Sequence, residues 1–161
     1  MAAHSELIEA TLESRLESVE KAEELATEVC CRAGFGEEEQ HRIGMAVHES
    51  VINAVRHGNK SDLSKSVRLE FQVRPDRLVI HICDQGEGFD PGSIPDPLES
   101  ENLLKVSGRG IFLIRAFVDE FSVRHTQGVG TEVTMVKYRS TGSTLDQGGR
   151  HREHEGKNAP R

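Results

Sequence analysis

The apolar positions of the chain follow a helical period in its first third. Residues 19–33 repeat apolar side chains at spacings of three and four, which predicts a helix with Ser18 as its N-cap and Gly34 just after its end. The same spacing recurs over residues 37–57, where acidic residues occupy the first turn. We therefore predict a second helix there, ended by Gly58.

After the second helix the period changes from 3.6 to two. Apolar and polar residues alternate over residues 67–74, as in a half-buried strand, and residues 78–83 are nearly all apolar, as in a more buried one. Pro75-Asp76 between them predicts a turn. The remaining predictions are a first strand over 7–13, a short helix over 110–119 and a hairpin of strands 121–125 and 131–138.

Two segments lack periodicity. Residues 84–107 are rich in Gly, Pro and Asp, and loops of this length within a compact domain are usually functional. Residues 140–161 contain Gly, Ser, His and charged residues, with Leu145 as the one large apolar side chain. Such a segment buries too little apolar surface to order itself. We therefore predict one domain over residues 1–139 and a disordered polar tail over residues 140–161.

Composition narrows the possible functions. The 161 residues carry a formal charge of −7 with no basic run in the body of the domain, which argues against direct binding of nucleic acid. The three cysteines lack metal-site spacing, and no apolar run reaches the about 18 residues of a membrane span. These features predict a cytoplasmic protein without membrane contact whose partner is another protein or a small charged ligand.

Polar residues gather on the second predicted helix and after the buried strand. Glu49, Asn53 and His57 follow one another at i, i+4, so they project from nearly one face and suit a metal ion and a water molecule. Asp84 stands where the buried strand ends, and Gly86 and Gly88 follow it. The glycines allow the backbone to approach a ligand closely, and the acid can accept a hydrogen bond from an exocyclic amine.

The aperiodic loop closes at Ser107-Gly108-Arg109-Gly110, directly before the short helix. Backbone N–H groups at a helix start suit phosphate oxygens. The chain has no Walker-type cradle and no nucleophile elbow, and Pro91 and Pro95 stand where a Rossmann helix would begin. These residues therefore point to a nucleotide bound in another way.

In this order the three segments resemble the N-box and the two glycine boxes of the GHKL ATPase superfamily, and Gly130-Thr131 resembles its Gly-Thr element. The resemblance covers about residues 7–138. The sequence from Glu49 to Gly58 and the segment that begins at Gly108 are most similar to the anti-sigma-factor serine/threonine kinases. This resemblance implies an α+β two-layer sandwich, with helices on one face of a mixed, mostly antiparallel sheet, and the nucleotide ATP between helix and lid.

The resemblance also implies residue roles. Asn53 would ligate Mg²⁺, and Glu49 would be the catalytic base. His57 is as consistent with a structural hydrogen bond as with a nucleotide contact. Asp84 would bind the adenine amine. The other residues implied to bind the nucleotide are Gly86 and Gly88 in the pocket wall, Ser107, Gly108, Arg109 and Gly110 at the phosphates, and Thr131 at the adenine through water.

A kinase of this family would restrain a sigma factor, phosphorylate a serine or threonine of an anti-anti-sigma partner, and form a homodimer, as the resemblance implies. The alternative is a nucleotide-gated binding module without significant phosphotransfer. Glu49 favours the kinase, because a pure binder needs no base. A small ATPase without a protein substrate is a third interpretation.

Overall fold

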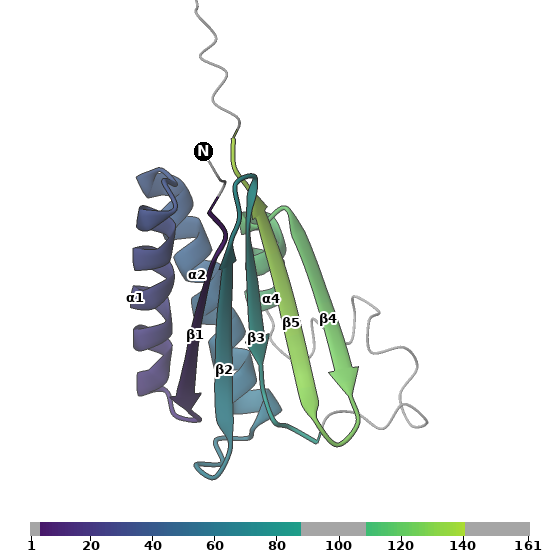
Figure 1. The fold of residues 1–161 in the computed structure, drawn as a ribbon. Coiled ribbons are helices and arrows are strands. Elements are labelled where there is room, and N and C mark those ends of the chain that lie inside the picture. The colour runs from purple at the N-terminus through teal and green to yellow at the C-terminus, as the bar shows by residue number, and fades with distance from the viewer. Residues whose placement is uncertain (1–3, 88–108, 141–161) are drawn as a thin grey trace, which may run out of the picture.

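The computed structural model describes residues 4–87 and 109–140, and for Arg109 the backbone alone. Each element that the sequence pattern predicted within these residues is present, with ends that differ by at most a few residues (Figure 1). In chain order the elements are β1 (Glu6–Glu13), α1 (Glu17–Arg32), α2 (Glu37–Asn53), the π-helical turn η1 (Ala54–Gly58), β2 (Ser66–Val73), β3 (Arg77–Cys83), α4 (Arg109–Phe117), β4 (Glu120–Thr126) and β5 (Gly130–Tyr138).

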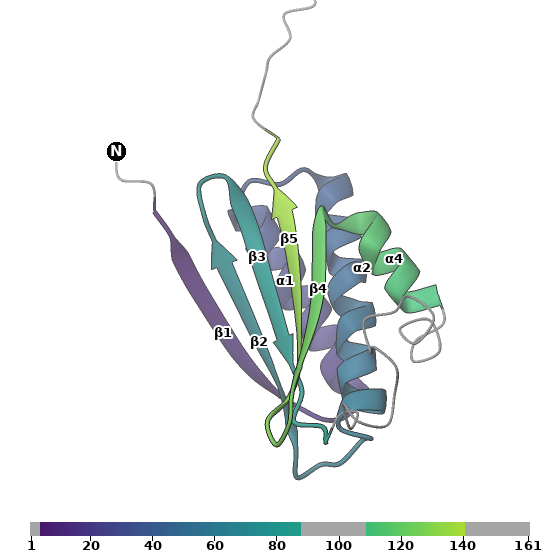
Figure 2. The ribbon, with the colours of Figure 1, turned by 90° about the vertical axis from the view of Figure 1, so that its right-hand side faces the viewer.

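The five strands of the described residues form one sheet in the order β1-β2-β3-β5-β4. We predicted a mixed, mostly antiparallel sheet, and all four strand pairs of the described residues are antiparallel. The three α-helices lie together against one face of this sheet (Figure 2). The predicted α+β two-layer sandwich is therefore confirmed.

The core lies between these two layers. Alternate residues of β2 point toward the helices, among them Leu69 and Phe71, both fully buried. From the helical layer, α2 contributes Ile43, Val47 and Val51, which are also inaccessible to solvent. Strand residues alternate between the two faces of a sheet, so the buried residues of β2 are the ones that the period of two predicted.

The predictions for the two ends of α1 have different outcomes. Gly34 has a φ of +87°, and its N–H and that of Phe35 bond to the carbonyls of Cys31 and Cys30, as in a Schellman motif. The predicted helix end is therefore confirmed. The predicted N-cap is wrong, because Leu16 already has helical torsion angles and Ser18 is buried inside the first turn.

The second helix is not uniform. Its α-helical part ends at Asn53, and the chain continues as a π-helical turn in which the N–H of Asn59 bonds to the carbonyl of Ala54 at 2.8 Å. The wider turn changes the angular phase of the residues after Asn53. Such π-turns occur frequently at functional sites. The helix ends at Gly58, as the sequence predicted.

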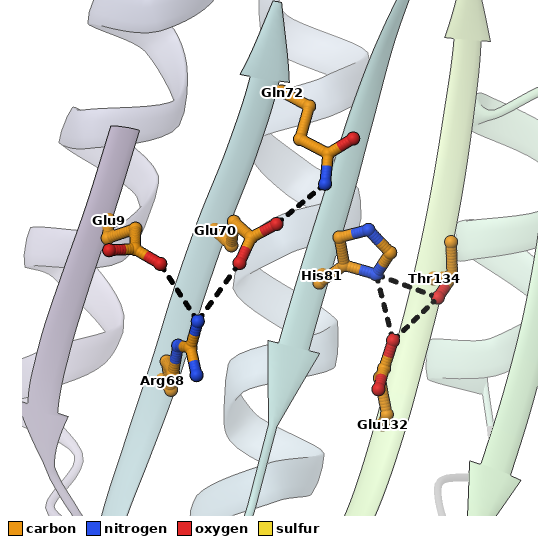
Figure 3. A network of polar contacts seen from close by, with 7 residues as sticks. All are labelled: Glu9, Arg68, Glu70, Gln72, His81, Glu132 and Thr134. Carbon is orange, nitrogen blue, oxygen red and sulfur yellow. Dashed lines mark hydrogen bonds and ion pairs between the residues drawn. The ribbon is translucent and has the colours of Figure 1, made fainter. Parts of the chain in front are cut away.

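The other face of the sheet carries polar side chains that pair with one another (Figure 3). Arg68 on β2 bonds to Glu9 on β1 and to its neighbour Glu70. His81 on β3 lies 3.0 Å, through Nδ1, from the hydroxyl of Thr134 on β5. These partners explain how the polar half of the alternating pattern is accommodated on an exposed sheet surface.

Candidate functional site

A cavity of about 560 Å³ lies between the helical layer and the sheet. This volume is within the range of small-molecule sites, roughly 300–1,000 Å³. Its helical wall is built by α2 and η1, its opposite wall by β3, β4 and β5, and Ile111 reaches it from the first turn of α4. The lining side chains include Ser50, Asn53, His57, Ile82, Asp84, Val123, Thr131 and Val133.

Asp84 is the buried charged residue of this cavity, with 8% of its surface exposed. Its position follows from the sheet, because it directly follows β3 and its N–H still bonds to the carbonyl of Thr131 at 2.9 Å. Its Oδ1 accepts hydrogen bonds from the N–H groups of Gly86, at 2.9 Å, and Thr131, at 3.1 Å. Its Oδ2 accepts none from the described residues, so this oxygen is available to a hydrogen-bond donor in the cavity.

Burial raises the pKa of the Asp84 carboxyl above its ordinary value. The two backbone hydrogen bonds to Oδ1 oppose this rise, and so does the positive charge of Lys65. A buried carboxylate with a free oxygen is a strong acceptor for a neutral or charged N–H donor. The site therefore suits a ligand that presents an amine.

Two glycines leave the space in which Asp84 fits. A Cβ atom on Gly58 would lie 2.1 Å from Oδ2 of Asp84, and one on Gly86 would lie 2.2 Å from the carbonyl oxygen of Gly58. Both distances are far inside van der Waals contact. The end of η1 and the segment after β3 thus pack closely, and a larger residue would displace the carboxylate if placed at Gly58 and the backbone of Gly58 if placed at Gly86.

Of the three helix residues predicted from the i, i+4 spacing, two are brought together at the cavity. Asn53 and His57 line the cavity, although His57 belongs to the π-turn and is largely exposed. Glu49 is half-buried on α2, one turn before Asn53, and is not among the described residues that line the cavity. The structure therefore places Asn53 in the cavity wall, and Glu49 is not among the described residues of that wall.

The side-chain oxygen of Asn53 fits the ligand set of Mg²⁺, which takes few protein oxygens and keeps water and phosphate oxygens for its other positions. Among the described residues no three His, Cys, Asp or Glu side chains are grouped as a metal site. This donor set suits a cation held jointly with a phosphate ligand, and does not suit an all-protein cage.

Several predicted site residues lie outside the described part of the chain, namely Gly88, Ser107 and Gly108. Arg109 and Gly110 form the start of α4, and Gly110 is buried there. Since neighbouring Ile111 lines the cavity, the N-terminal turn of α4 faces it. The positive end of a helix dipole at such a helix start favours anionic ligands.

Sequence reasoning missed Asn59, which is 1% exposed. Its Nδ2 donates to the hydroxyl of Ser14, at 2.7 Å, and to the carbonyl of Ser66, at 2.9 Å. Its Oδ1 accepts from the N–H of Gln85 at 2.7 Å. Asn59 therefore ties the end of β1, the start of β2 and the segment after Asp84 together. Its place directly after the His57-Gly58 motif is a weak signal, because Asn after a helix is common in turns.

Two further missed residues are His125 and Lys65. His125 on β4 lies beside Thr131, with 3.0 Å between Nδ1 and Oγ1. Lys65 lines the mouth of the cavity and carries the positive charge that acts on Asp84. Neither belongs to a recognisable motif, so only the folded arrangement identifies them.

The comparisons with known proteins agree with this geometry. Residues 12–137 match the family model of the histidine kinase-like ATPase domain. The chain is 36% identical over 117 residues to the serine-protein kinase RsbW of Staphylococcus epidermidis, a match that covers 68% of this chain and 72% of that protein. It is 28% identical over 116 residues to the RsbW proteins of Listeria innocua and Listeria monocytogenes, covering 68% of this chain and 73% of each. No helix of the described residues is long and apolar enough to cross a membrane. The chain therefore belongs to the histidine kinase-like ATPase domain family.

Proposed function

We propose that this protein is an ATP-dependent serine/threonine kinase that restrains a sigma factor and phosphorylates an anti-anti-sigma partner. The observation that carries the ATP-binding part is the buried Asp84 carboxylate with its free Oδ2, which faces a cavity whose opposite wall presents Asn53. The similarity to proteins named serine-protein kinases supports the kinase part. Cytoplasmic location and a homodimer belong to the same proposal and rest on the resemblance.

In this proposal Asp84 selects and orients the nucleotide. Its Oδ2 accepts a hydrogen from the exocyclic amine of adenine, and the apolar side chains of Ile82 and Val133 exclude water around the base. Asn53 would hold Mg²⁺ by its amide oxygen. When bound, Mg²⁺ neutralises the phosphate charge that develops as the terminal phosphoryl group is transferred.

Glu49 is the proposed base. A serine or threonine oxygen of the partner attacks the terminal phosphorus, the bond from that phosphorus to the bridging oxygen breaks, and ADP leaves. The hydroxyl proton passes to the Glu49 carboxylate. The place of Glu49, one turn before Asn53 and outside the described cavity wall, is consistent with a proton acceptor that meets a protein substrate at the mouth of the site.

The rival function is a nucleotide-gated binding module with little phosphotransfer, in which Glu49, outside the described cavity wall, has no role as a base. Both functions need ATP binding, so only transfer separates them. We would incubate the protein with γ-labelled ATP, Mg²⁺ and candidate anti-anti-sigma proteins, and follow label on a serine or threonine. Steady phosphate release without any protein partner would instead indicate a simple ATPase.

Two variants test the residue roles. Glu49→Gln should keep Mg-ATP affinity and lose transfer by about 10²–10⁴-fold, the usual contribution of a general base. Asn53→Ala should weaken ATP binding in the presence of Mg²⁺ much more than in its absence. Glu24→Gln, a change of an exposed glutamate on α1, is the matched control and should leave both properties unchanged. Normal transfer by Glu49→Gln and Asn53→Ala would contradict the assigned roles.

A further inference from the structure

His125 contacts Thr131, one of the residues proposed to bind the adenine base. The two residues are direct cross-strand partners of β4 and β5, and Nδ1 of His125 lies 3.0 Å from Oγ1 of Thr131. The backbone N–H of Thr131 bonds to Oδ1 of Asp84, so Thr131 and the carboxylate of Asp84 are held side by side. Thr131 and Asp84 both line the cavity.

The other ring nitrogen of His125 determines the direction of this hydrogen bond. Nε2 is buried and has no hydrogen-bond partner among the described residues. A proton on Nε2 would be a buried donor without a partner, and orphaned buried N–H groups are rarer in proteins than under-satisfied acceptors. We therefore assign a ring proton to Nδ1, which donates it to Oγ1 of Thr131. The hydroxyl proton of Thr131 is then left to donate into the cavity.

We propose that His125 is a specificity-determining positioning residue, which fixes the hydroxyl of Thr131 as a hydrogen-bond donor beside the acceptor Asp84. This inference rests on the proposed ATP site. The amine of adenine is flanked by ring nitrogens that accept hydrogen bonds, which matches an acceptor with a donor next to it, directly or through a water molecule. Guanine has a carbonyl oxygen in place of the amine and would face the Asp84 carboxylate with an acceptor. His125 thereby increases the preference for adenine over guanine nucleotides.

The molecule contains a matched control on its other face. His81 and Thr134 form a similar cross-strand pair, also with 3.0 Å between Nδ1 and Oγ1, on the open surface of the sheet, where Nδ1 of His81 lies 3.0 Å from Oε1 of Glu132 as well (Figure 3). Neither residue lines the cavity. Loss of His81 removes its contacts to Thr134 and Glu132 on the open face of the sheet without removing a residue that lines the cavity.

The experiment measures the dissociation constants of ATP and GTP by competition against a ribose-labelled fluorescent nucleotide. The wild type should prefer ATP. His125→Leu should lower this preference about tenfold, the value of one hydrogen bond, and His125→Asn, whose amide can donate in place of Nδ1, should keep it within about threefold. His81→Leu should leave the preference unchanged.

Thr131→Val shows whether His125 acts through the hydroxyl. Thr131→Val alone should lower the ATP preference about as much as His125→Leu does, and His125→Leu should cause no further loss in the Thr131→Val background. This variant keeps the test valid if His125→Leu does not fold. An unchanged preference in Thr131→Val, or an equal further loss from His125→Leu in its presence, would overturn the inference while leaving the ATP site intact. A wild type that binds neither nucleotide would overturn the proposed function itself.

Discussion

Replacement of Asp84 by asparagine is the sharpest test of the site, because it removes the charge and keeps the shape. Oδ1 of Asp84 accepts the N–H groups of Gly86 and Thr131, and the amide oxygen of Asn can accept both. The change is therefore confined to Oδ2, which becomes an NH₂ group facing the cavity. An acceptor for the adenine amine is replaced by a donor.

The size of the effect follows from this one hydrogen bond. A hydrogen bond to a charged group contributes about 1.5–3 kcal/mol, which corresponds to a loss of ATP affinity of about 10- to 150-fold. The amine of adenine then faces the new amide NH₂ group, so the loss should lie toward the upper end. A base with a carbonyl oxygen in place of the amine gains a partner, and affinity for GTP or inosine triphosphate should not fall in parallel.

The assay is isothermal titration with ATP, GTP and inosine triphosphate at neutral pH. Equal ATP affinity of Asp84→Asn and wild type would refute the assignment of Asp84 to the amine, and an equal loss for all three nucleotides would indicate general damage to the pocket.

The stability of the nucleotide-free protein is an independent test of how the buried charge of Asp84 affects the fold. Because burial raises the pKa of Asp84, the folded state binds this proton more tightly than the unfolded state does. The stabilisation from this tighter proton binding is present below the pKa that Asp84 has in the unfolded state. It is lost as the pH rises through the pKa that Asp84 has in the folded state. Asp84→Asn should therefore be more stable than wild type at pH 7, and this advantage should shrink in acid. Thermal unfolding at several pH values measures it, and a less stable variant at pH 7 would contradict the reasoning.

Three more changes test the surroundings of the site. Gly58→Ala places a Cβ 2.1 Å from Oδ2 of Asp84 and should lose ATP binding and about 1–3 kcal/mol of stability in urea unfolding, while Gly36→Ala, where a Cβ meets no atom within 4 Å, should bind ATP normally. Asn59→Ala removes three hydrogen bonds, to buried Ser14 and to the backbones of Ser66 and Gln85, and should cost at least about 2 kcal/mol by the same method, so a cost below about 0.5 kcal/mol would contradict its bracing role. Cys30 is buried with a pKa raised to about 12, so at pH 8 a thiol reagent should react rapidly with exposed Cys31 alone, and Cys31→Ser should remove that fast phase.

The sequence by itself determined the elements and the faces that they bury. The alternation that ends at Val73 and the apolar run that ends at Cys83 correspond to β2 and β3, and Gly34 ends α1 as expected. These signals are local, because a period of two or 3.6 and the torsion freedom of one glycine are set by a few neighbouring residues. The motifs around Asn53 and Asp84 were readable for the same reason.

Only the tertiary structure decided how the site is assembled. Asn59 bonds to Ser14, 45 residues earlier, and Thr131 bonds to Asp84, 47 residues away. No local pattern encodes such contacts, because they depend on strand order: β5 lies beside β3 and brings Thr131 and its partner His125 to the carboxylate. The π-turn after Asn53 is likewise a feature that no local pattern of the sequence predicted. It lets Gly58 meet Asp84, and that close packing is a property of the folded layers.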